Sequence, residues 1–452
     1  MHVNPTINQY NNQTIELSDR SVRECTPISQ MSNHSQINTT IDHLFRRESG
    51  KLVAVLTGIF GPHNLQMAED VVQDTLIKAM DNWKYRGIPD NPSAWLFRVA
   101  KNQALDIIRK QKTRLQYEKS ISTLLNSEYS LAPLVNELMN RQDIADDQLR
   151  MMFTCCHPSL PLESQVALVL KTLCGFSIGE IARAFICSND TIEKRLYRAR
   201  QQFREQKIEF LIPDLLQTGN RLDNVLTAVY LLFNEGYNST QNEDLIRKDL
   251  LDEAIRLAQL LVKHPNTRAP KVYALLSLMY FTIARTDARQ DKDGNILLLK
   301  DQDRRLWNRN FIKIAIDFLE ESSTADDISI YHLQAGIARE HMLSPAYDRT
   351  NWNNILHLYD LHYAINPSPV VALNRAIVVA ELYGPKAGIE AIEMIPEKNA
   401  IEKYYLLPAT LGEFYKKLDD PLKAKTYYQE AIGLTQSAAE QNLLQKKISD
   451  LH

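Results

Sequence analysis

The chain alternates between stretches of helical period and short polar breaks. After a polar leader, residues 1–40, apolar residues recur with the spacing of one helix face from Ile41 to about Lys112. Gly61-Pro62 and the stretch from Gly87 to Pro92 interrupt this pattern, because glycine and proline end helices. The pattern predicts a first helical module at 41–112.

A second compact module is predicted at 147–213, after a polar linker at 113–146 that contains Pro133. From 214 to 452, helical patterns follow at intervals of roughly 15 to 20 residues, which indicates stacked helix pairs. One pair matches the tetratricopeptide template, in which small and aromatic residues mark close helix crossings. The matching residues are Leu411, Gly412, Tyr415, Ala424, Tyr428 and Ala431. We therefore expect a tetratricopeptide-like repeat domain in the C-terminal half.

Composition favours an all-α protein, because 14 glycines and 18 prolines in 452 residues are few for a turn-rich sheet fold. Five cysteines without paired spacing favour reduced thiols over a disulfide framework. The leader is rich in Asn, Gln, Ser and Thr, which predicts disorder, and it lacks the pattern of a secretory signal. The longest apolar run, Val272 to Ala284, is shorter than the roughly 20 residues of a membrane span. We expect a cytoplasmic protein that has no membrane partner.

The net charge of −3 is unevenly distributed along the chain. Seven basic residues face two acidic ones from Trp95 to Lys119, and six face three from Asn189 to Lys207. Two basic segments within an otherwise acidic chain predict two local contacts with nucleic-acid phosphates.

The predicted helix from Leu65 to Trp83 has an apolar inner stripe and an acidic outer face. The stripe consists of Ala68, Val72, Leu76, Ala79 and Trp83, and the outer face carries Asp70, Gln73, Asp74, Ile77 and Asp81. An apolar residue among acidic and amide groups is typical of a docking surface. A solvated face with one exposed apolar residue is the alternative, since scattered surface apolar residues are normal.

The next predicted helix runs from Pro92 to about Gln111, with proline at a position where its missing N–H costs nothing. Its inner stripe is Leu96, Ala100, Ala104 and Ile107, and its outer side carries Trp95, Arg98, Asn102 and Arg109. An aromatic ring, cations and an amide can together stack on an unpaired base, neutralise phosphate and hydrogen-bond a base edge. A packed Trp with solvated Arg side chains is the structural alternative.

A helix-turn-helix is predicted from Ser177 to about Phe203. A short first helix ends at Ala184, the turn occupies Phe185 to Ser188, and Ser188 is placed to cap the second helix. The second helix has an inner stripe of Ile192, Leu196, Ala199 and Phe203. Its outer face carries Asp190, Glu193, Lys194, Tyr197, Arg198 and Gln201. Such an exposed polar face suits the major groove of DNA.

Together these segments resemble the extracytoplasmic-function sigma factors of the sigma-70 family. Region 2 of that family is similar to Ala68–Thr75 and to the Trp-Leu-x-x-x-Ala-x-Asn pattern of Trp95–Asp106, and region 4 is similar to Glu180–Ala182 with Thr191–Arg200. This resemblance covers 41–210. Four further segments look like the subgroup with a C-terminal tetratricopeptide-like extension, in which Ile186 is no departure from the family's usual turn glycine. They are Thr154–Pro158, Ala184-Phe185, Leu231–Tyr237 and Ala372–Ala376.

The resemblance implies a sigma factor that binds core RNA polymerase and directs it to promoters. It places the docking residues Asp70, Gln73, Asp74 and Ile77 on the clamp helices of the largest subunit, and region 4 on the flap of the second largest. It assigns the minus-ten element to region 2 and the minus-thirty-five element to region 4. In region 2, it implies that the loop from Lys84 to Asn91 helps to choose a flipped base. The DNA-contacting residues it implies are Trp95, Arg98, Lys101, Asn102 and Arg109 in region 2, and Asn189, Thr191, Lys194, Arg195 and Arg198 in region 4.

Other interpretations account for less of the sequence. A helix-turn-helix regulator that acts without polymerase has no use for the two region-2 helices, and a pure protein-interaction scaffold leaves the basic segments unexplained. Cys155-Cys156-His157 offers zinc ligands, but adjacent cysteines chelate one ion poorly, so packing is favoured and a redox sensor stays open. No phosphate loop, His-Glu-x-x-His helix or nucleophile elbow occurs, so we expect neither an enzyme nor a cofactor. We expect the repeat domain to regulate the sigma modules through a protein or ligand partner. This domain contains a polar cluster that is either a ligand site or a set of salt bridges, formed by Asp301, Asp303, Arg304 and Trp307.

Overall fold

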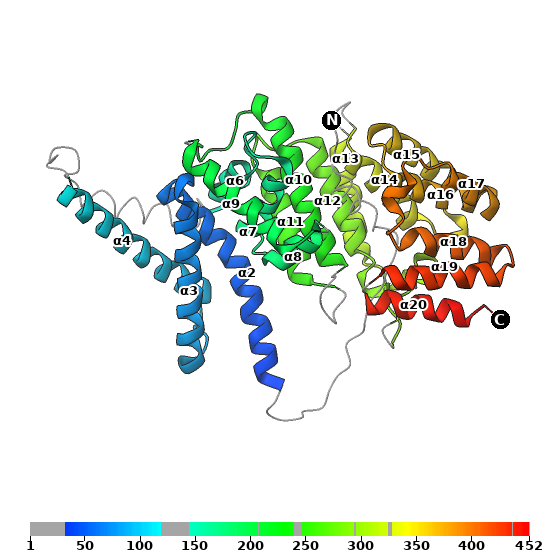
Figure 1. The fold of residues 1–452 in the computed structure, drawn as a ribbon, viewed down its shortest axis with the longest axis horizontal. Coiled ribbons are helices and arrows are strands. Elements are labelled where there is room, and N and C mark those ends of the chain that lie inside the picture. Colours follow the sequence, from blue (N-terminus) through cyan, green and yellow to red (C-terminus); the bar gives the residue numbers. More distant parts are fainter. Residues whose placement is uncertain are drawn as a thin grey trace. The chain divides into compact units, whose positions relative to one another are not determined.

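Helices make up the regular structure of the computed structural model (Figure 1), and Gln290 and Ile296 form one isolated bridge. The structure describes residues 32–118, 144–185, 187–206, 208–238, 246–292, 295–323, 328–435 and 437–451. The all-α fold class is confirmed for this part of the chain. Cys25, Ile186, most of the predicted leader and the centre of the predicted linker lie outside these residues.

The chain divides into two compact units. The N-terminal unit lies within Cys25–Leu232 and adds Lys263–Thr267, and the C-terminal unit comprises Phe233–Val262 and Arg268–His452. Helix α10 (Leu215–Tyr237) begins in the first unit and ends in the second. The predicted domain border at 213 therefore lies just before α10, whereas the first part of α10 still belongs to the N-terminal unit.

The N-terminal unit holds the two predicted modules. The first module contains α2 (Ser32–Phe60), the short 3₁₀ helix η2 (Pro62–Asn64), α3 (Leu65–Arg86) and α4 (Pro92–Glu118). The second module contains α6 (Ile144–Cys155), α7 (Leu162–Thr172), α8 (Ile178–Ala184) and α9 (Asn189–Glu205). Gly61 and Gly87 adopt φ of 81° and 78°, which an L side chain rarely tolerates, so the predicted breaks on either side of α3 are confirmed.

The C-terminal unit is a succession of helices that pack against their neighbours along the chain. The α-helices are α11 (Lys248–Lys263), α12 (Pro270–Ile283), α13 (Arg309–Ser322), α14 (Ile330–Leu343), α15 (Trp352–Ile365), α16 (Pro369–Tyr383), α17 (Pro385–Glu393), α18 (Leu406–Lys417), α19 (Pro421–Leu434) and α20 (Ala438–Ser449). The 3₁₀ helices are η3 (Thr286–Ala288), η4 (Leu299–Asp301), η5 (Arg304–Leu306), η6 (Tyr347–Arg349) and η7 (Lys398–Ile401).

The helix pair α18 and α19 shows the close crossing expected from the repeat template. A β-carbon at Gly412 would lie 2.7 Å from the ring of Tyr428, and Ala424, Tyr428 and Ala431 are fully buried. A larger residue at 412 would force the helices apart, because packed interiors leave no spare volume. The tetratricopeptide-like character of the whole domain stays a prediction.

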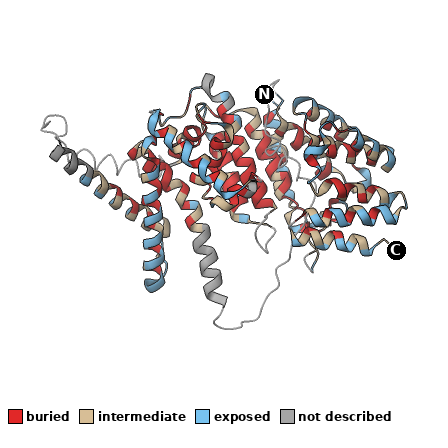
Figure 2. Ribbon diagram, viewed as in Figure 1, coloured by how far each residue is buried: buried red, intermediate tan, exposed pale blue. Residues whose placement is uncertain are grey.

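Buried side chains run along the facing sides of the helices in both units, and exposed residues line the outer side of α3 (Figure 2). In the described residues, each helix is too short or too polar to cross a bilayer.

Candidate nucleic-acid interface

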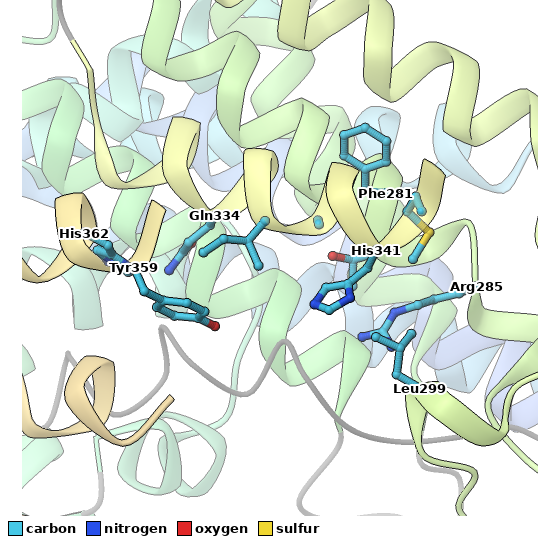
Figure 3. Close-up of a pocket in the computed structure, with 11 residues that line it drawn as sticks. Phe281, Arg285, Leu299, Gln334, His341, Tyr359 and His362 are labelled. Carbon is cyan, nitrogen blue, oxygen red and sulfur yellow. The ribbon is translucent and has the colours of Figure 1, made fainter. Parts of the chain in front are cut away.

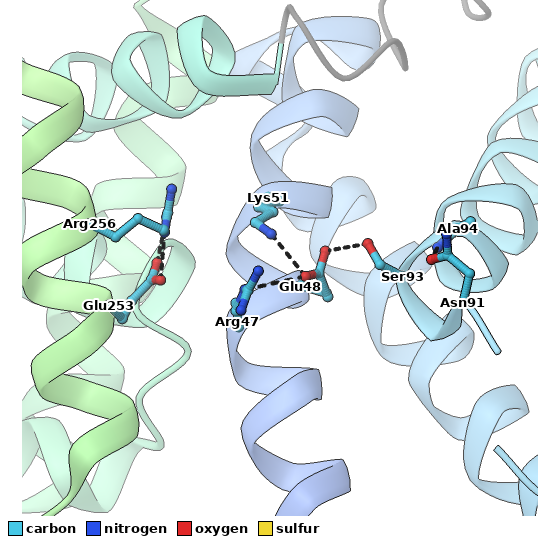
Figure 4. Close-up of polar contacts among 8 residues, drawn as sticks. All are labelled: Arg47, Glu48, Lys51, Asn91, Ser93, Ala94, Glu253 and Arg256. Atoms are coloured by element: carbon cyan, nitrogen blue, oxygen red, sulfur yellow. Dashed lines mark hydrogen bonds and ion pairs between the residues drawn. The ribbon is translucent and has the colours of Figure 1, made fainter. Parts of the chain in front are cut away.

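The start of α4 is fixed to α2 by one buried carboxylate, Glu48. Its oxygens accept hydrogen bonds from Lys51 at 2.8 Å and from Ser93 in the first turn of α4 at 2.9 Å (Figure 4). Asn91 caps the same turn, because its side-chain oxygen accepts from the backbone N–H of Ala94 at 3.0 Å. These bonds set the direction in which α4 leaves the loop.

Aromatic packing holds the α4 side chain Trp95 against α3. The ring of Trp95 meets that of Trp83 edge-on with centroids 5.4 Å apart, and Trp83 also contacts Phe45 of α2. About two turns further along, Gln103 donates to the hydroxyl of Thr75 at 3.1 Å. Trp95 is therefore half-buried, with one part of its ring packed and the rest open.

The predicted outer side of α4 is largely exposed. Arg98, Asn102 and Arg109 are exposed, Lys101 is half-buried, and the inner residues Leu96, Ala100 and Ala104 are fully buried. The 3.4 Å ion pair of Arg109 with Asp106 joins two exposed groups, so it contributes little to stability. The helix thus presents cations and an amide beside a partly open aromatic ring.

On α3 the predicted faces are also found. Ala68, Val72, Ala79 and Trp83 are buried, whereas Leu76 is partly buried. Asp70, Gln73, Asp74 and Ile77 are all exposed, and the side chain of Ile77 is 56% open. Sequence reasoning missed Met80, which is 59% exposed one turn beyond Ile77 and enlarges the apolar part of this face. Its spacing of three residues from Ile77 was the available signal.

The helix-turn-helix geometry rests on two caps. Glu180 accepts from the backbone N–H of Ser177 at 2.7 Å, and Ser177 accepts from that of Glu180, which forms a capping box at α8. Ser188 accepts from the backbone N–H of Thr191 at 3.3 Å, as predicted for the start of α9. Its hydroxyl also lies 2.9 Å from that of Thr191, so this threonine is engaged in the cap.

The outer face of α9 is exposed at the predicted positions, and its inner stripe is buried. Asn189, Lys194 and Arg198 lie on the open side, where Lys194 pairs with Asp190 at 2.7 Å. Arg195 is half-buried because its guanidinium packs 5.4 Å from the ring centre of Phe185. Arg195 and Arg198 also line a surface hollow of about 380 Å³ beside the start of α7.

Long-range ion pairs join the two modules within the N-terminal unit. Arg200 of α9 makes two hydrogen bonds to Glu69 of α3, at 2.9 and 3.1 Å, and both side chains are largely buried. Arg46 of α2 bonds to Glu180 at 3.1 Å. Sequence reasoning found neither pair, because their partners lie more than a hundred residues apart.

A close backbone approach adds to this contact. A β-carbon at Gly50 of α2 would lie 2.1 Å from the carbonyl oxygen of Leu173, at the end of α7. Glycine therefore lets the first module lie directly on the second. The helices that carry the exposed faces, α3, α4 and α9, therefore belong to two modules in direct contact.

The Cys155-Cys156 pair is buried at the junction of α6 and α7. Both thiols are fully buried, and the sulfur of Cys155 lies 3.6 Å from the hydroxyl of Thr172. Burial raises the pKa of Cys155 to about 12 and that of Cys156 well above its ordinary value. A protonated, buried thiol is a poor metal ligand and a poor nucleophile, so the packing interpretation fits best. In the described residues, no three side chains of the metal-binding types gather at one place.

The Asp303 cluster of the C-terminal unit is built from internal pairs. Asp303 accepts from Arg305 at 2.7 Å, and Arg304 donates to the backbone oxygens of His341 and Ser344 at 2.7 Å. The guanidinium of Arg304 lies 4.4 Å from the ring centre of Trp307. These contacts favour the salt-bridged alternative for this cluster.

Comparison with protein families gives three matches along the chain. Residues 44–114 match sigma-70 region 2, and residues 150–203 match sigma-70 region 4. Residues 221–323 match a family of unknown function, DUF6596. The first two matches cover the helices that carry the exposed faces of α3, α4 and α9.

The chain is similar to an uncharacterized protein over most of its length and to ECF sigma factors over its N-terminal part. An uncharacterized protein of Rhizobium meliloti is 35% identical over 390 residues, which is 86% of this chain and 90% of the relative. The ECF RNA polymerase sigma-E factor of Escherichia coli K12 is 29% identical over 149 residues, 32% of this chain and 74% of the relative. The ECF RNA polymerase sigma factor SigE of Mycolicibacterium smegmatis is 28% identical over 167 residues, 36% of this chain and 60% of the relative. No solved structure matches the chain.

Proposed function

The chain belongs to the extracytoplasmic-function sigma factors of the sigma-70 family, with a C-terminal extension. From this premise we propose that it reads minus-ten and minus-thirty-five promoter elements, and that the extension controls this activity. Members of this family are non-catalytic initiation factors that work with core RNA polymerase and promoter DNA. The first module is region 2, and the second is region 4.

The exposed outer face of α3 is the proposed docking surface for the polymerase. Asp70 and Asp74 supply negative charge, Gln73 an amide, and Ile77 with Met80 an apolar centre. A desolvated apolar centre with a charged rim is the usual composition of a protein interface. We assign this face to the clamp helices of the largest subunit, and region 4 to the flap of the second largest.

The proposed DNA contacts divide between the two modules. In region 2, Arg98 and Asn102 lie on the exposed side of α4, next to the partly open ring of Trp95, and this set suits an unstacked strand at the minus-ten element. In region 4, Lys194 and Arg198 on α9 suit the major groove and phosphates of the minus-thirty-five duplex. The presence of both exposed faces in one chain is the observation that carries the proposal.

Promoter binding requires the two modules to separate. The two elements lie about 25 base pairs apart, or roughly 85 Å along the duplex at 3.4 Å per pair. In the structure, Arg200 of the DNA-reading helix lies 2.9 Å from Glu69 of region 2. We infer that the described arrangement is a closed form, which must open before both elements are bound.

The proposal predicts different defects for changes in the two modules. Arg198→Ala is expected to weaken binding of the holoenzyme to the upstream element and to reduce the log–log salt slope by about 0.9, because one phosphate contact is lost. Arg98→Ala is expected to leave that binding intact and to reduce strand opening, measured by permanganate reactivity of unpaired thymines.

A second experiment tests the competing function, that of a regulator that acts without polymerase. Transcription and footprinting with purified core polymerase on a promoter pool should show specific protection by the holoenzyme. Tight, sequence-specific footprints by the free protein would instead assign the chain to regulators that act without polymerase. Arg204 is an exposed cation further along α9, so Arg204→Ala is the matched control for the loss of charge in Arg198→Ala.

Removal of the extension is expected to change promoter output several-fold, since we propose that it shifts the sigma modules between closed and polymerase-competent forms. The cut must follow residue 238. A cut at 214 would remove Arg221, which bonds to the carbonyl of Phe153, and Asn224, which donates to Gln165 at 2.7 Å. Equal output from full-length and shortened chains at matched core occupancy would contradict this regulation.

A further inference from the structure

Tyr197 is an exposed aromatic residue on α9, the second helix of the helix-turn-helix. Its side chain is 62% exposed, and its ring has no aromatic or cationic partner in the described part of the chain. The inner stripe of α9 is complete without it, because Ile192, Leu196, Ala199 and Phe203 are buried. A single exposed apolar residue needs no explanation by itself, so the position of Tyr197 on the helix decides what it can contact.

Tyr197 lies on the outward side of α9. At about 100° per residue, it shares this side with Asp190, Lys194 and Gln201, which are all exposed. These polar neighbours are paired along the helix, since Lys194 donates to Asp190 at 2.7 Å and Gln201 donates to Glu205 at 2.8 Å. Tyr197 is the one large apolar side chain that the described residues of α9 expose. Its ring therefore forms the apolar part of the face that region 4 presents to DNA in the proposed function.

The position of Tyr197 along α9 suits a contact with base edges. The residue lies in the third turn, about 12 Å from the first residue of the helix. The major groove of DNA is about 12 Å wide and admits an α-helix, whose N-terminal part reads the bases. A ring on the outward side within the first three turns is therefore placed to enter the groove.

Paired bases offer such a ring one apolar contact in the major groove. Stacking on a base requires an unpaired strand, whereas region 4 reads a duplex in the proposed function. The groove edges of the base pairs present hydrogen-bond donors and acceptors, and thymine adds a methyl group at C5. Contact between the ring and this methyl group removes both apolar surfaces from water without leaving a polar group unpaired.

Resting on the proposed function of region 4, we propose that Tyr197 selects a thymine of the minus-thirty-five element by packing its ring against the C5 methyl group. Phosphate contacts of Lys194 and Arg198 attract every DNA sequence alike, so they position the helix without selecting a base. Tyr197 adds discrimination at one base pair. Burial of one methyl-sized group corresponds to about a fourfold difference in affinity.

The test uses the full-length protein in the holoenzyme, on a promoter that footprinting has selected from the pool. Each thymine of the upstream element, on either strand, is replaced in turn by deoxyuridine, which keeps the base pairing and lacks the methyl group. With the unchanged protein, binding is expected to weaken about fourfold at one of these thymines. Tyr197→Ser should bind the thymine and deoxyuridine promoters equally, whereas Tyr197→Phe should keep the fourfold difference because the ring remains.

A matched control separates this role from a general effect of losing an exposed tyrosine. Tyr383 is 66% exposed on α16, so Tyr383→Ser should keep the fourfold difference. Circular dichroism of Tyr197→Ser should not change, since the ring is not packed.

Three results would overturn the selection of thymine by Tyr197. They are an upstream element without an A·T pair, equal binding of thymine and deoxyuridine promoters by the unchanged holoenzyme, and a difference that persists in Tyr197→Ser. If that persistence came with weaker assembly of Tyr197→Ser with core polymerase, the ring would belong to a polymerase contact instead. A holoenzyme that leaves the upstream element unprotected would contradict the proposed function of region 4 itself, and this inference with it.

Discussion

Reversing the charges of Asp70 and Asp74 to lysine is expected to abolish co-purification of the protein with core RNA polymerase. Both side chains are exposed on α3, so the double change leaves the packing of the helix intact. Like charges brought together in an interface cost several kcal/mol, which corresponds to a loss of affinity on the order of a hundredfold or more. The helical content, measured by circular dichroism, should not change.

A matched control exists in the C-terminal unit. Asp317 and Glu321 lie on α13 with the same spacing and are also exposed. Their double replacement by lysine changes the net charge of the protein by the same amount, and it should leave polymerase binding unaltered. Normal binding of core by the Asp70→Lys/Asp74→Lys protein would show that α3 is not the docking surface.

Arg200→Glu is expected to open the closed arrangement of regions 2 and 4. The substitution places two carboxylates against each other where Arg200 now makes two bonds to the largely buried Glu69. Breaking a partly buried pair costs about 2 kcal/mol, which is a roughly thirtyfold shift toward separated modules. Energy transfer between labels at the exposed positions 78 and 201 should fall accordingly.

Charge exchange supplies the internal check on this opening. In the double variant Glu69→Arg/Arg200→Glu the pair can re-form, so the transfer efficiency should return toward its original value. Arg204→Glu removes a cation from the exposed side of the same helix and should leave the modules together. Unchanged transfer in the Arg200→Glu protein would mean that this pair does not hold the regions closed.

The local features of the sigma modules could be predicted from the sequence because they depend on neighbours along the chain. Helical period alone assigned Ala68 and Val72 of α3 to the core and Asp70 and Asp74 to the surface. The break at Gly87 was predictable because glycine readily adopts the positive φ found there, and the start of α9 was predictable because Ser188 is a good helix cap. Such features need only a few consecutive residues, so the order of the motifs was already enough to indicate the family.

The tertiary structure decided which polar residues meet across the fold. The helical period places Glu69 beside the inner stripe, but nothing in the sequence selects Arg200 as its partner 131 residues away. In the same way, His341 and His362 read as ordinary helix residues until α14 and α15 place them at opposite ends of one cavity in the C-terminal unit (Figure 3). Long-range contacts depend on how helices pack, and amphipathic patterns specify which face is buried without specifying what it is buried against. The closed arrangement of regions 2 and 4 and the cavity of the C-terminal unit were therefore visible only in the folded chain.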